Sequence, residues 1–297
     1  DGWATRPATR AGQVTRLAKS SDLIIAEGVM GLFDGAADGT GSSADLAAEL
    51  GLPVILIVDV SGQSASAAAV VMGFNEFRDD IKIAGVIFNR VGSARHEQML
   101  RRAMASVSIP ILGCLSRDET LALDSRHLGL VQASELGDLD KQIDAAATLI
   151  SNTIDFNTLT TLSEPLRVSA PMSTAPVPRI GQRIAVASDT AFSFSYPHIL
   201  KGWQEAGATI STFSPLADEA PALDCDAVYL PGGYPELHAG KIAANENFMA
   251  GLHQAAKRDA QIYGECGGFM VLGQSLTDRD GKTHAMAGLL PIETSFA

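Results

Sequence analysis

A single cysteine, Cys266, stands between a short apolar run and two glycines in Ile262–Met270 (IYGECGGFM). This order is typical of a strand, a sharp turn and a helix start, which hold a nucleophile outward on a strained backbone. Free N–H groups at a helix start favour a thiolate and can stabilise an oxyanion. The alternative is a buried structural cysteine in a tight turn, because free cysteines are commonly buried.

A second glycine pair follows the apolar run Ala227–Leu230 (AVYL), in the sequence LPGGYPEL. There Gly232 and Gly233 could present backbone N–H groups to a substrate carbonyl. An ordinary glycine-containing loop is the alternative interpretation.

In the first half, Glu27–Gly35 (EGVMGLFDG) directly follows the apolar run Leu23–Ala26 (LIIA). Parallel sheets bind ligands outside the carboxyl ends of their strands. Glu27 and Asp34 could therefore hold Mg²⁺ and position phosphates, because Mg²⁺ prefers carboxylate oxygens. A glycine-rich surface loop with two solvated acids is the alternative.

The two glycine-rich segments of the second half together resemble the class I glutamine amidotransferase domain of cobyrinate-type amidases. The resemblance implies that Cys266 attacks L-glutamine to release ammonia, with Gly232, Gly233 and Gly267 in the oxyanion region. In that family the catalytic histidine lies well beyond the cysteine. Only His284 follows here, in a segment (DGKTHA) that reads as a hairpin turn, so it is not assigned this role. We expect the chain to stop short of the general base.

EGVMGLFDG is similar to the matching segment of cobyrinic and hydrogenobyrinic acid a,c-diamide synthases, which are P-loop ligases related to dethiobiotin synthetase. The resemblance covers nearly the whole chain. It continues through Thr40–Asp59, Asn89–Ser93 and Arg126–Leu130.

This second resemblance implies that ATP phosphorylates a side-chain carboxylate of a corrin ring and that ammonia displaces the phosphate. The a and c acetate groups are amidated in turn. Glu27 would be the Mg²⁺ ligand, Asp34 would serve the same region, and Asn89 would face the adenine.

Several residues near these motifs keep two interpretations. Asn89 could cap a turn instead. Asp59, after VILIV, resembles a Walker B aspartate but could simply begin a loop, and it is left unassigned. His127 could touch substrate or only pack. No G-x-x-x-x-G-K-[ST] occurs, and in the family that loop lies upstream of a DGW segment like the one that opens this chain. We therefore expect half an ATP site here.

Alternating apolar runs and helical stretches predict an α/β fold with two domains. We expect an ATP-dependent synthetase domain over residues 1–157, a proline-containing linker over 158–181 and an amidotransferase domain over 182–297. The expected strands are Leu23–Ala26, Val54–Val58, Ile83–Phe88, Ile109–Leu112, Arg183–Ala187, Thr209–Phe213, Ala227–Leu230 and Gln261–Tyr263.

Composition narrows the class of protein. A formal charge of −12 with no basic run argues against nucleic-acid binding. The three cysteines form no CxxC pair, which suits a reducing cytosol and predicts a cytoplasmic protein. No apolar run approaches the ~20 residues of a membrane helix. A homo-oligomer stays open.

Other functions compete with the diamide synthase. Cobyric acid synthase amidates other side chains of the same ring system. A non-catalytic tetrapyrrole- or nucleotide-binding relative would explain a missing phosphate loop and histidine, but not the intact Cys266, Glu27 and Asp34. A partitioning-type ATPase would leave the glutaminase segments unexplained. Whether the ring carries cobalt is left open.

Overall fold

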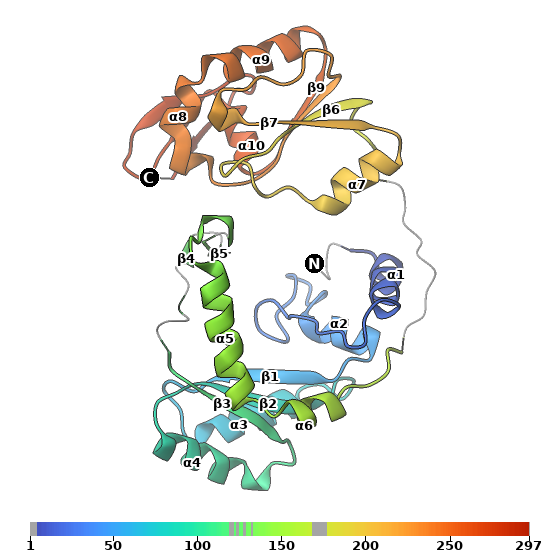
Figure 1. The fold of residues 1–297 in the computed structure, drawn as a ribbon, viewed down its shortest axis with the longest axis vertical. Helices are drawn as coiled ribbons and strands as arrows, with labels where there is room; N and C mark the ends of the chain where they lie inside the picture. The colour runs from blue at the N-terminus through green and yellow to red at the C-terminus, as the bar shows by residue number, and fades with distance from the viewer. Residues whose placement is uncertain are drawn as a thin grey trace. The chain divides into compact units, whose positions relative to one another are not determined.

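The computed structural model describes residues 5–118, 122, 125–126, 129–131, 133–167 and 177–296. Contacts between Cα atoms divide the chain into two compact units, Asp1–Thr174 and Ala175–Ala297. Each unit has its own sheet and its own buried core. Figure 1 shows the helices and strands of each unit with their labels. The two units are described separately below.

The first unit contains a parallel three-stranded sheet in the order β1-β2-β3. Its strands are β1 (Val54–Asp59), β2 (Ile83–Val91) and β3 (Ile111–Ser116). Because successive side chains of a strand point to opposite faces, Phe88 and Ile87 pack into different cores. The sheet is therefore buried on both sides, as the apolar strands predict.

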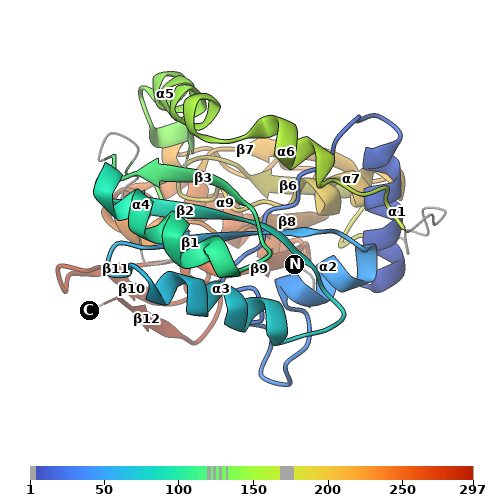
Figure 2. The ribbon, with the colours of Figure 1, turned by 90° about the horizontal axis from the view of Figure 1, so that it is seen from below.

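Helices cover both faces of this sheet. Phe88 shares a core with residues of α3 (Ser66–Glu76) and α4 (Ala94–Ala103), and Ile87 shares one with Ile154 and Leu159 at the end of α5 and in α6. Figures 1 and 2 show α3 and α4 on one side of the sheet and α5 and α6 on the other. The remaining elements of the unit are α1 (Pro7–Ala18), α2 (Ser43–Leu50), η1 (Met104–Ser106), β4 (Ser125–Arg126), β5 (Gly129–Leu130), η3 (Ala133–Glu135), α5 (Leu139–Thr153) and α6 (Phe156–Thr161).

The second unit contains a parallel four-stranded sheet in the order β7-β6-β8-β9. The strands are β6 (Arg183–Ala187), β7 (Thr209–Phe213), β8 (Ala227–Leu230) and β9 (Gln261–Gly264). One face packs on α7 (Pro197–Glu205) through Trp203, and the other packs on α9 (Glu246–Lys257) and α10 (Gly267–Val271) through Phe248 and Val271. This is again the layered α/β arrangement that the sequence predicts.

A small mixed sheet, in the order β11-β10-β12, follows Cys266 in the chain. Its strands are β10 (Ser275–Thr277), β11 (Thr283–Ala285) and β12 (Glu293–Ser295). The hairpin predicted around His284 is present, but His284 lies in β11 and not in the turn. The other short elements are η4 (Pro215–Ala217), η5 (Pro235–His238) and α8 (Ala239–Ala244).

One expected strand is wrong. The run Leu23–Ala26 is not a strand, and the side chain of Ile25 is 81% exposed. A strand exists only where a neighbouring strand completes its hydrogen-bond ladder. Among the described residues, Leu23–Ala26 pairs with no strand, and β1 forms the edge of the sheet. Apolar composition alone therefore does not predict a strand correctly at Leu23–Ala26.

The segment between the predicted domains is partly helical. The expected linker covers residues 158–181, and its first four residues, 158–161, belong to α6. Residues 168–176 of that segment lie outside the described residues. The domain limits at 157 and 182 remain predictions.

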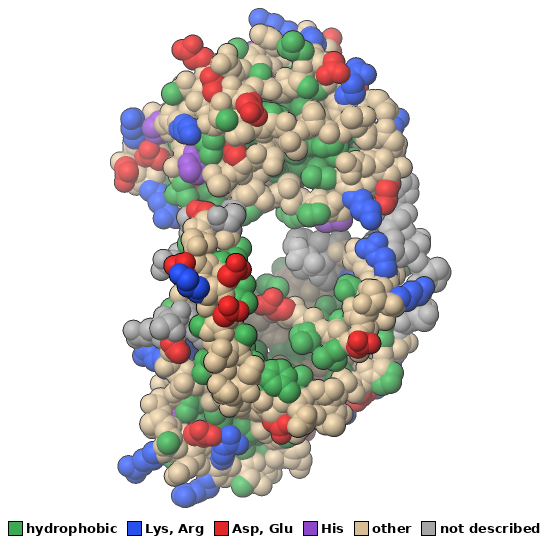
Figure 3. All heavy atoms as spheres, viewed as in Figure 1, with side chains coloured by type: hydrophobic (Ala, Val, Ile, Leu, Met, Phe, Trp, Pro, Cys, Tyr) green, Lys and Arg blue, Asp and Glu red, His purple; other side chains and the backbone are tan. Residues whose placement is uncertain are grey.

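The described part of the chain contains no helix both long and apolar enough to span a membrane. On the face shown in Figure 3, acidic and basic side chains lie interspersed.

Candidate functional site

The backbone at Cys266 is in an unusual conformation. Its φ is +49° and its ψ is −115°, between the end of β9 and the first residue of α10. A non-glycine residue at positive φ stores strain of roughly 1–3 kcal/mol and persists only where its surroundings hold it. The predicted strand, turn and helix start are therefore present, and the turn has the strain expected of a nucleophile elbow.

The sulfur-bearing side chain is accessible. Cys266 is exposed, whereas Cys114 and Cys225 are buried. Burial raises the pKa of both buried thiols above the ordinary value, which makes them poor nucleophiles at neutral pH. Of the three cysteines, Cys266 is the one placed to react with a molecule from solution.

The second glycine segment lies directly against the elbow. A Cβ atom built on Gly232 would stand 3.1 Å from the Cβ of Cys266, and one built on Gly267 would stand 3.3 Å from the backbone nitrogen of Gly233. The structure thus brings Cys266, Gly232, Gly233 and Gly267 together. Their neighbouring N–H groups can stabilise negative charge on a carbonyl oxygen under attack by the thiolate.

Glycine is required at two of these turns by the space available. A Cβ on Gly233 would stand 2.1 Å from the carbonyl oxygen of Ala191, and one on Gly268 would stand 2.0 Å from that of Leu230. The segment is also held by an isolated bridge, in which the Phe194 N–H donates to the Gly232 carbonyl at 2.9 Å. These close approaches fix the glycine backbone beside Cys266.

His284 forms a hydrogen bond with Asp278, not with Cys266. Its Nε2 lies 2.7 Å from a carboxylate oxygen of Asp278, and its side chain is 8% exposed. The bond to His284 and the backbone N–H of Lys282 hold the pKa of Asp278 below its usual value. This pair closes the β10–β11 hairpin, which is consistent with leaving His284 without a catalytic role.

In the first unit, Asn89 lies near the carboxyl end of β2, opposite Asp59 at the end of β1. The guanidinium of Arg90 donates to the Asp59 carboxylate at 3.0 Å, and the Asn89 carbonyl accepts from the Val60 N–H at 3.0 Å. The Asn89 side-chain oxygen accepts from the Arg90 N–H, which is the turn-capping contact. Among the described residues, the amide nitrogen of Asn89 has no hydrogen-bond partner.

His96 joins the two loops that follow these strands. Its Nδ1 accepts from the Gly92 N–H at 3.1 Å, so the ring donates from Nε2 to the Gln63 carbonyl at 2.6 Å. His96 was not singled out in the sequence, because a histidine in a helix carries no signal of such a contact.

The EGVMGLFDG loop is exposed at both of its acids. Asp34 Oδ2 accepts from the Gly31 N–H at 3.0 Å in a tight turn, and Glu27 stands on the surface. Among the described residues, no common hydrogen-bond or ion-pair partner links Glu27 to Asp34. Among the described residues, no group of three or more His, Cys, Asp or Glu side chains could hold a metal ion.

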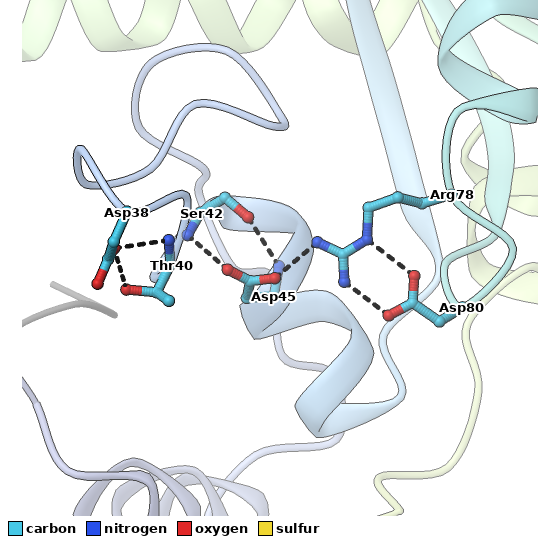
Figure 4. A network of polar contacts seen from close by, with 6 residues as sticks. All are labelled: Asp38, Thr40, Ser42, Asp45, Arg78 and Asp80. Atoms are coloured by element: carbon cyan, nitrogen blue, oxygen red, sulfur yellow. Dashed lines mark hydrogen bonds and ion pairs between the residues drawn. The ribbon is translucent and has the colours of Figure 1, made fainter.

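A polar network fixes the chain after this loop (Figure 4). Ser42 and Asp45 form a reciprocal capping box at the start of α2. Arg78 bridges that box to Asp80, donating to Asp45 at 2.6 Å and to both Asp80 oxygens. Hydrogen bonds to the two carboxylates raise the pKa of Arg78 further. This network was not predicted, because nothing in the spacing relates Asp45 to Arg78.

His127 lies outside the described residues, so its two interpretations stay predictions.

Comparisons with known proteins give the same two parts. A family model described as a CobB/CobQ-like glutamine amidotransferase domain matches residues 183–297, and one described as an AAA domain matches residues 5–124. A hydrogenobyrinate a,c-diamide synthase of Brucella anthropi is 54% identical over the whole chain, which covers 69% of that relative. The enzymes of the same name from Rhizobium meliloti and Mesorhizobium japonicum are 52% and 50% identical, and the chain covers 69% and 68% of them.

Proposed function

The chain belongs to the hydrogenobyrinate a,c-diamide synthase family, and from this premise we propose that it amidates the a and c acetate carboxylates of a corrin ring. Glutamine supplies the nitrogen and ATP activates the carboxylate. The observation that carries the proposal is the exposed Cys266 on its strained turn, with Gly232 against its Cβ. The match of residues 5–124 to an AAA domain supports nucleotide binding by the first unit.

In the glutaminase half, the Cys266 thiolate attacks the side-chain amide carbon of glutamine. The C–N bond breaks, the nitrogen leaves with a proton as ammonia, and water then hydrolyses the thioester to glutamate. Backbone N–H groups of Gly233 and Gly267, with Gly232 beside them, stabilise the oxyanion formed in both steps.

In the synthetase half, a carboxylate oxygen of the ring attacks the γ-phosphorus of ATP, and ADP leaves. Ammonia then attacks the acyl phosphate, and inorganic phosphate leaves as the amide bond forms. Asn89 would contact the adenine with its amide group, since no described residue accepts from that nitrogen and it lies next to the carboxyl ends of β1 and β2.

The acids of the EGVMGLFDG loop suit Mg²⁺, which proteins often bind through one or two carboxylates together with substrate phosphates. Glu27 would hold the ion, which when bound would neutralise charge on the transferred phosphoryl group. Asp34 would act in the same region while its bond to the Gly31 N–H keeps the loop turned.

The relatives are hydrogenobyrinate a,c-diamide synthases, which favours the cobalt-free ring over cobyrinate and a,c-diamide synthesis over cobyric acid synthesis. L-glutamine and a corrin are the small-molecule partners. We infer a cytoplasmic protein, because ATP and glutamine are available in that compartment.

The proposal is tested by glutamine hydrolysis with the protein extended at both ends to the length of the relatives, of which this chain covers 69%. Cys266→Ala should lower the rate of ammonia release by more than about a thousand-fold, because the nucleophile is removed. Cys225→Ala is the control, since Cys225 is buried in the core of the same unit, and it should keep the rate within about three-fold if folded. Hydrolysis that survives Cys266→Ala would refute the assignment. A silent wild-type protein would instead favour a non-catalytic binding relative.

A further inference from the structure

Three side chains gather on one face of the sheet beside the elbow. Tyr229 in β8 and Tyr263 in β9 are paired in register, and their rings stack with centroids 5.8 Å apart. Glu265 lies two residues after Tyr263, and residues two apart on an extended strand share a face. Trp203 of α7 packs edge-on against Tyr229 from the same side. A carboxylate therefore stands among aromatic rings, one residue before Cys266.

Both oxygens of that carboxylate are bound. The Tyr229 hydroxyl donates to Glu265 Oε1 at 2.6 Å, and the Tyr263 hydroxyl donates to Oε2 at 3.4 Å. A hydroxyl-to-carboxylate bond of 2.5–2.7 Å is charge-assisted and about twice as strong as a neutral one. The short bond comes from Tyr229, which is 1% exposed and packed in the core of the unit.

The backbone of Glu265 is bound as well. Its N–H donates to the Leu230 carbonyl at 3.1 Å, and its carbonyl accepts from the Gly268 N–H at 2.8 Å. Every hydrogen-bonding group of Glu265 thus has a partner on β8, on β9 or at the start of α10. On the other side of the elbow, the Cys266 carbonyl accepts from Met270 at 3.2 Å.

A residue with a strained backbone keeps its conformation only when its neighbours define it more strongly than the strain opposes it. Glu265 supplies that definition on the strand side of Cys266. We propose that Glu265 is the positioning residue of the nucleophile, and that its tether to Tyr229 aims the Cys266 thiolate at the amide carbon of glutamine. This inference rests on the proposed glutaminase function.

The hydroxyls remain donors throughout the working pH range. Burial, followed by the bond to Glu265, raises the pKa of Tyr229, and burial with the Glu265 charge raises that of Tyr263. Deprotonation would break the tether. The ordinary tyrosine pKa of about 10 already lies above neutral pH, and these shifts move it further away.

Two alkylating reagents distinguish the orientation of the Cys266 thiolate toward the glutamine site from the exposure of the thiol to solvent. A glutamine-shaped diazoketone reacts with Cys266 only when glutamine's site and the thiolate are aligned, whereas iodoacetamide requires an accessible thiol. The measurement is the rate of Cys266 labelling by each reagent, by peptide mass spectrometry, with Cys114 and Cys225 as buried internal references.

Glu265→Ala should lower the rate of diazoketone labelling by about ten- to a hundred-fold, because a misplacement near 1 Å costs up to about that factor. Glu265→Gln keeps an oxygen that can accept from Tyr229, so it should stay within about three-fold of wild type. Iodoacetamide labelling should change by less than about three-fold in both variants.

Tyrosine variants keep the test valid if Glu265→Ala fails to fold. Tyr229→Phe removes only the short bond and should lower diazoketone labelling by about ten-fold, whereas Tyr263→Phe removes the long, exposed one and should change it by less than about two-fold. Unchanged diazoketone labelling in Tyr229→Phe would overturn the proposal. A loss in Glu265→Gln as deep as in Glu265→Ala would also overturn it, since charge and not the tether would then matter.

Failure of the underlying function gives a different pattern. In that case iodoacetamide labels Cys266 in the wild type and the diazoketone does not. That outcome removes the glutaminase assignment, and the inference about Glu265 with it.

Discussion

Cys266 owes its position to the residues around it more than to its own preferences. Its backbone lies at φ +49°, where a side chain is unfavourable, while Glu265 before it and Gly267 after it are fixed by their contacts. Gly232 lies against the Cβ of Cys266, and Gly233 lies beside Gly267. The chemistry at this site therefore depends on small residues that leave room and on one large residue that holds the strand end.

Gly233→Ala is predicted to damage this site. The added Cβ would stand 2.1 Å from the Ala191 carbonyl oxygen, so the backbone that carries the Gly233 N–H must shift. Loss of one oxyanion donor lowers the rate by about 10²–10³-fold, and overpacking destabilises the unit by roughly 1–3 kcal/mol. Steady-state glutamine hydrolysis and thermal unfolding measure the two effects.

Gly73→Ala is the matched control for that substitution. A Cβ on Gly73, within α3, would meet nothing within 4 Å. It should raise stability by roughly 0.5–1 kcal/mol, because alanine favours a helix over glycine. Equal glutamine hydrolysis by Gly233→Ala and wild type would contradict the oxyanion role.

At the scale of elements, the sequence predicted most strands, and three of them to the residue. β6, β7 and β8 have the expected bounds: β8 is an apolar run (AVYL), β6 is one after its first arginine (RIAVA), and β7 (TISTF) is rich in β-branched and aromatic residues. The run Leu23–Ala26 has the same composition but pairs with no strand in the described residues. Apolar composition indicates whether a segment could be buried as a strand. Whether it forms one depends on hydrogen bonding to another strand, whose residues are distant in the sequence.

The candidate site divides in the same way. Cys266 and the glycines were predicted because their roles depend on local backbone geometry, which the motif itself contains. The tether from Tyr229 to Glu265 and the bridge from Arg78 to Asp45 were missed. Each joins residues more than thirty positions apart, and no periodicity connects them.

The Asp278–His284 bond in the β10–β11 hairpin should make the stability of the second unit depend on pH. The bond to His284 lowers the folded-state pKa of Asp278 below the value of about 3.9 expected when unfolded. A depressed carboxyl pKa stabilises the fold fully above the unfolded pKa, and the contribution is lost as pH falls through the folded one. Asp278→Asn should therefore lower the melting temperature at about pH 6, and the difference from wild type should shrink towards about pH 3.

Asp280→Asn is the control in the same turn. Within the part of the chain that the structure describes, the one hydrogen bond of Asp280 runs from its backbone N–H to Asp278 Oδ1. Its melting temperature should differ from wild type by a small amount that does not vary over that pH range. A gap between Asp278→Asn and wild type that is constant with pH would contradict the assigned role of the His284 bond.

At the scale of the whole molecule, the chain forms two α/β units with separate cores, and the proposed function gives each unit one part of the reaction. We propose that the second unit releases ammonia at Cys266 and that the first activates the carboxylate near Glu27, Asp34 and Asn89. If the two half-reactions are divided in this way, the glutaminase contributes nothing to the amidation except ammonia. Free ammonium should therefore replace glutamine when the cysteine is lost.

Transfer of nitrogen from glutamine to the ring tests the account most directly. The protein, extended at both ends to the length of the relatives, is incubated with hydrogenobyrinate, ATP, Mg²⁺ and glutamine labelled at its side-chain nitrogen, and the product is analysed by mass spectrometry. We predict two labelled amides per ring for the wild type, none for Cys266→Ala with glutamine, and restored amidation for Cys266→Ala with ammonium. A product without labelled nitrogen, or labelled product from Cys266→Ala, would contradict the account.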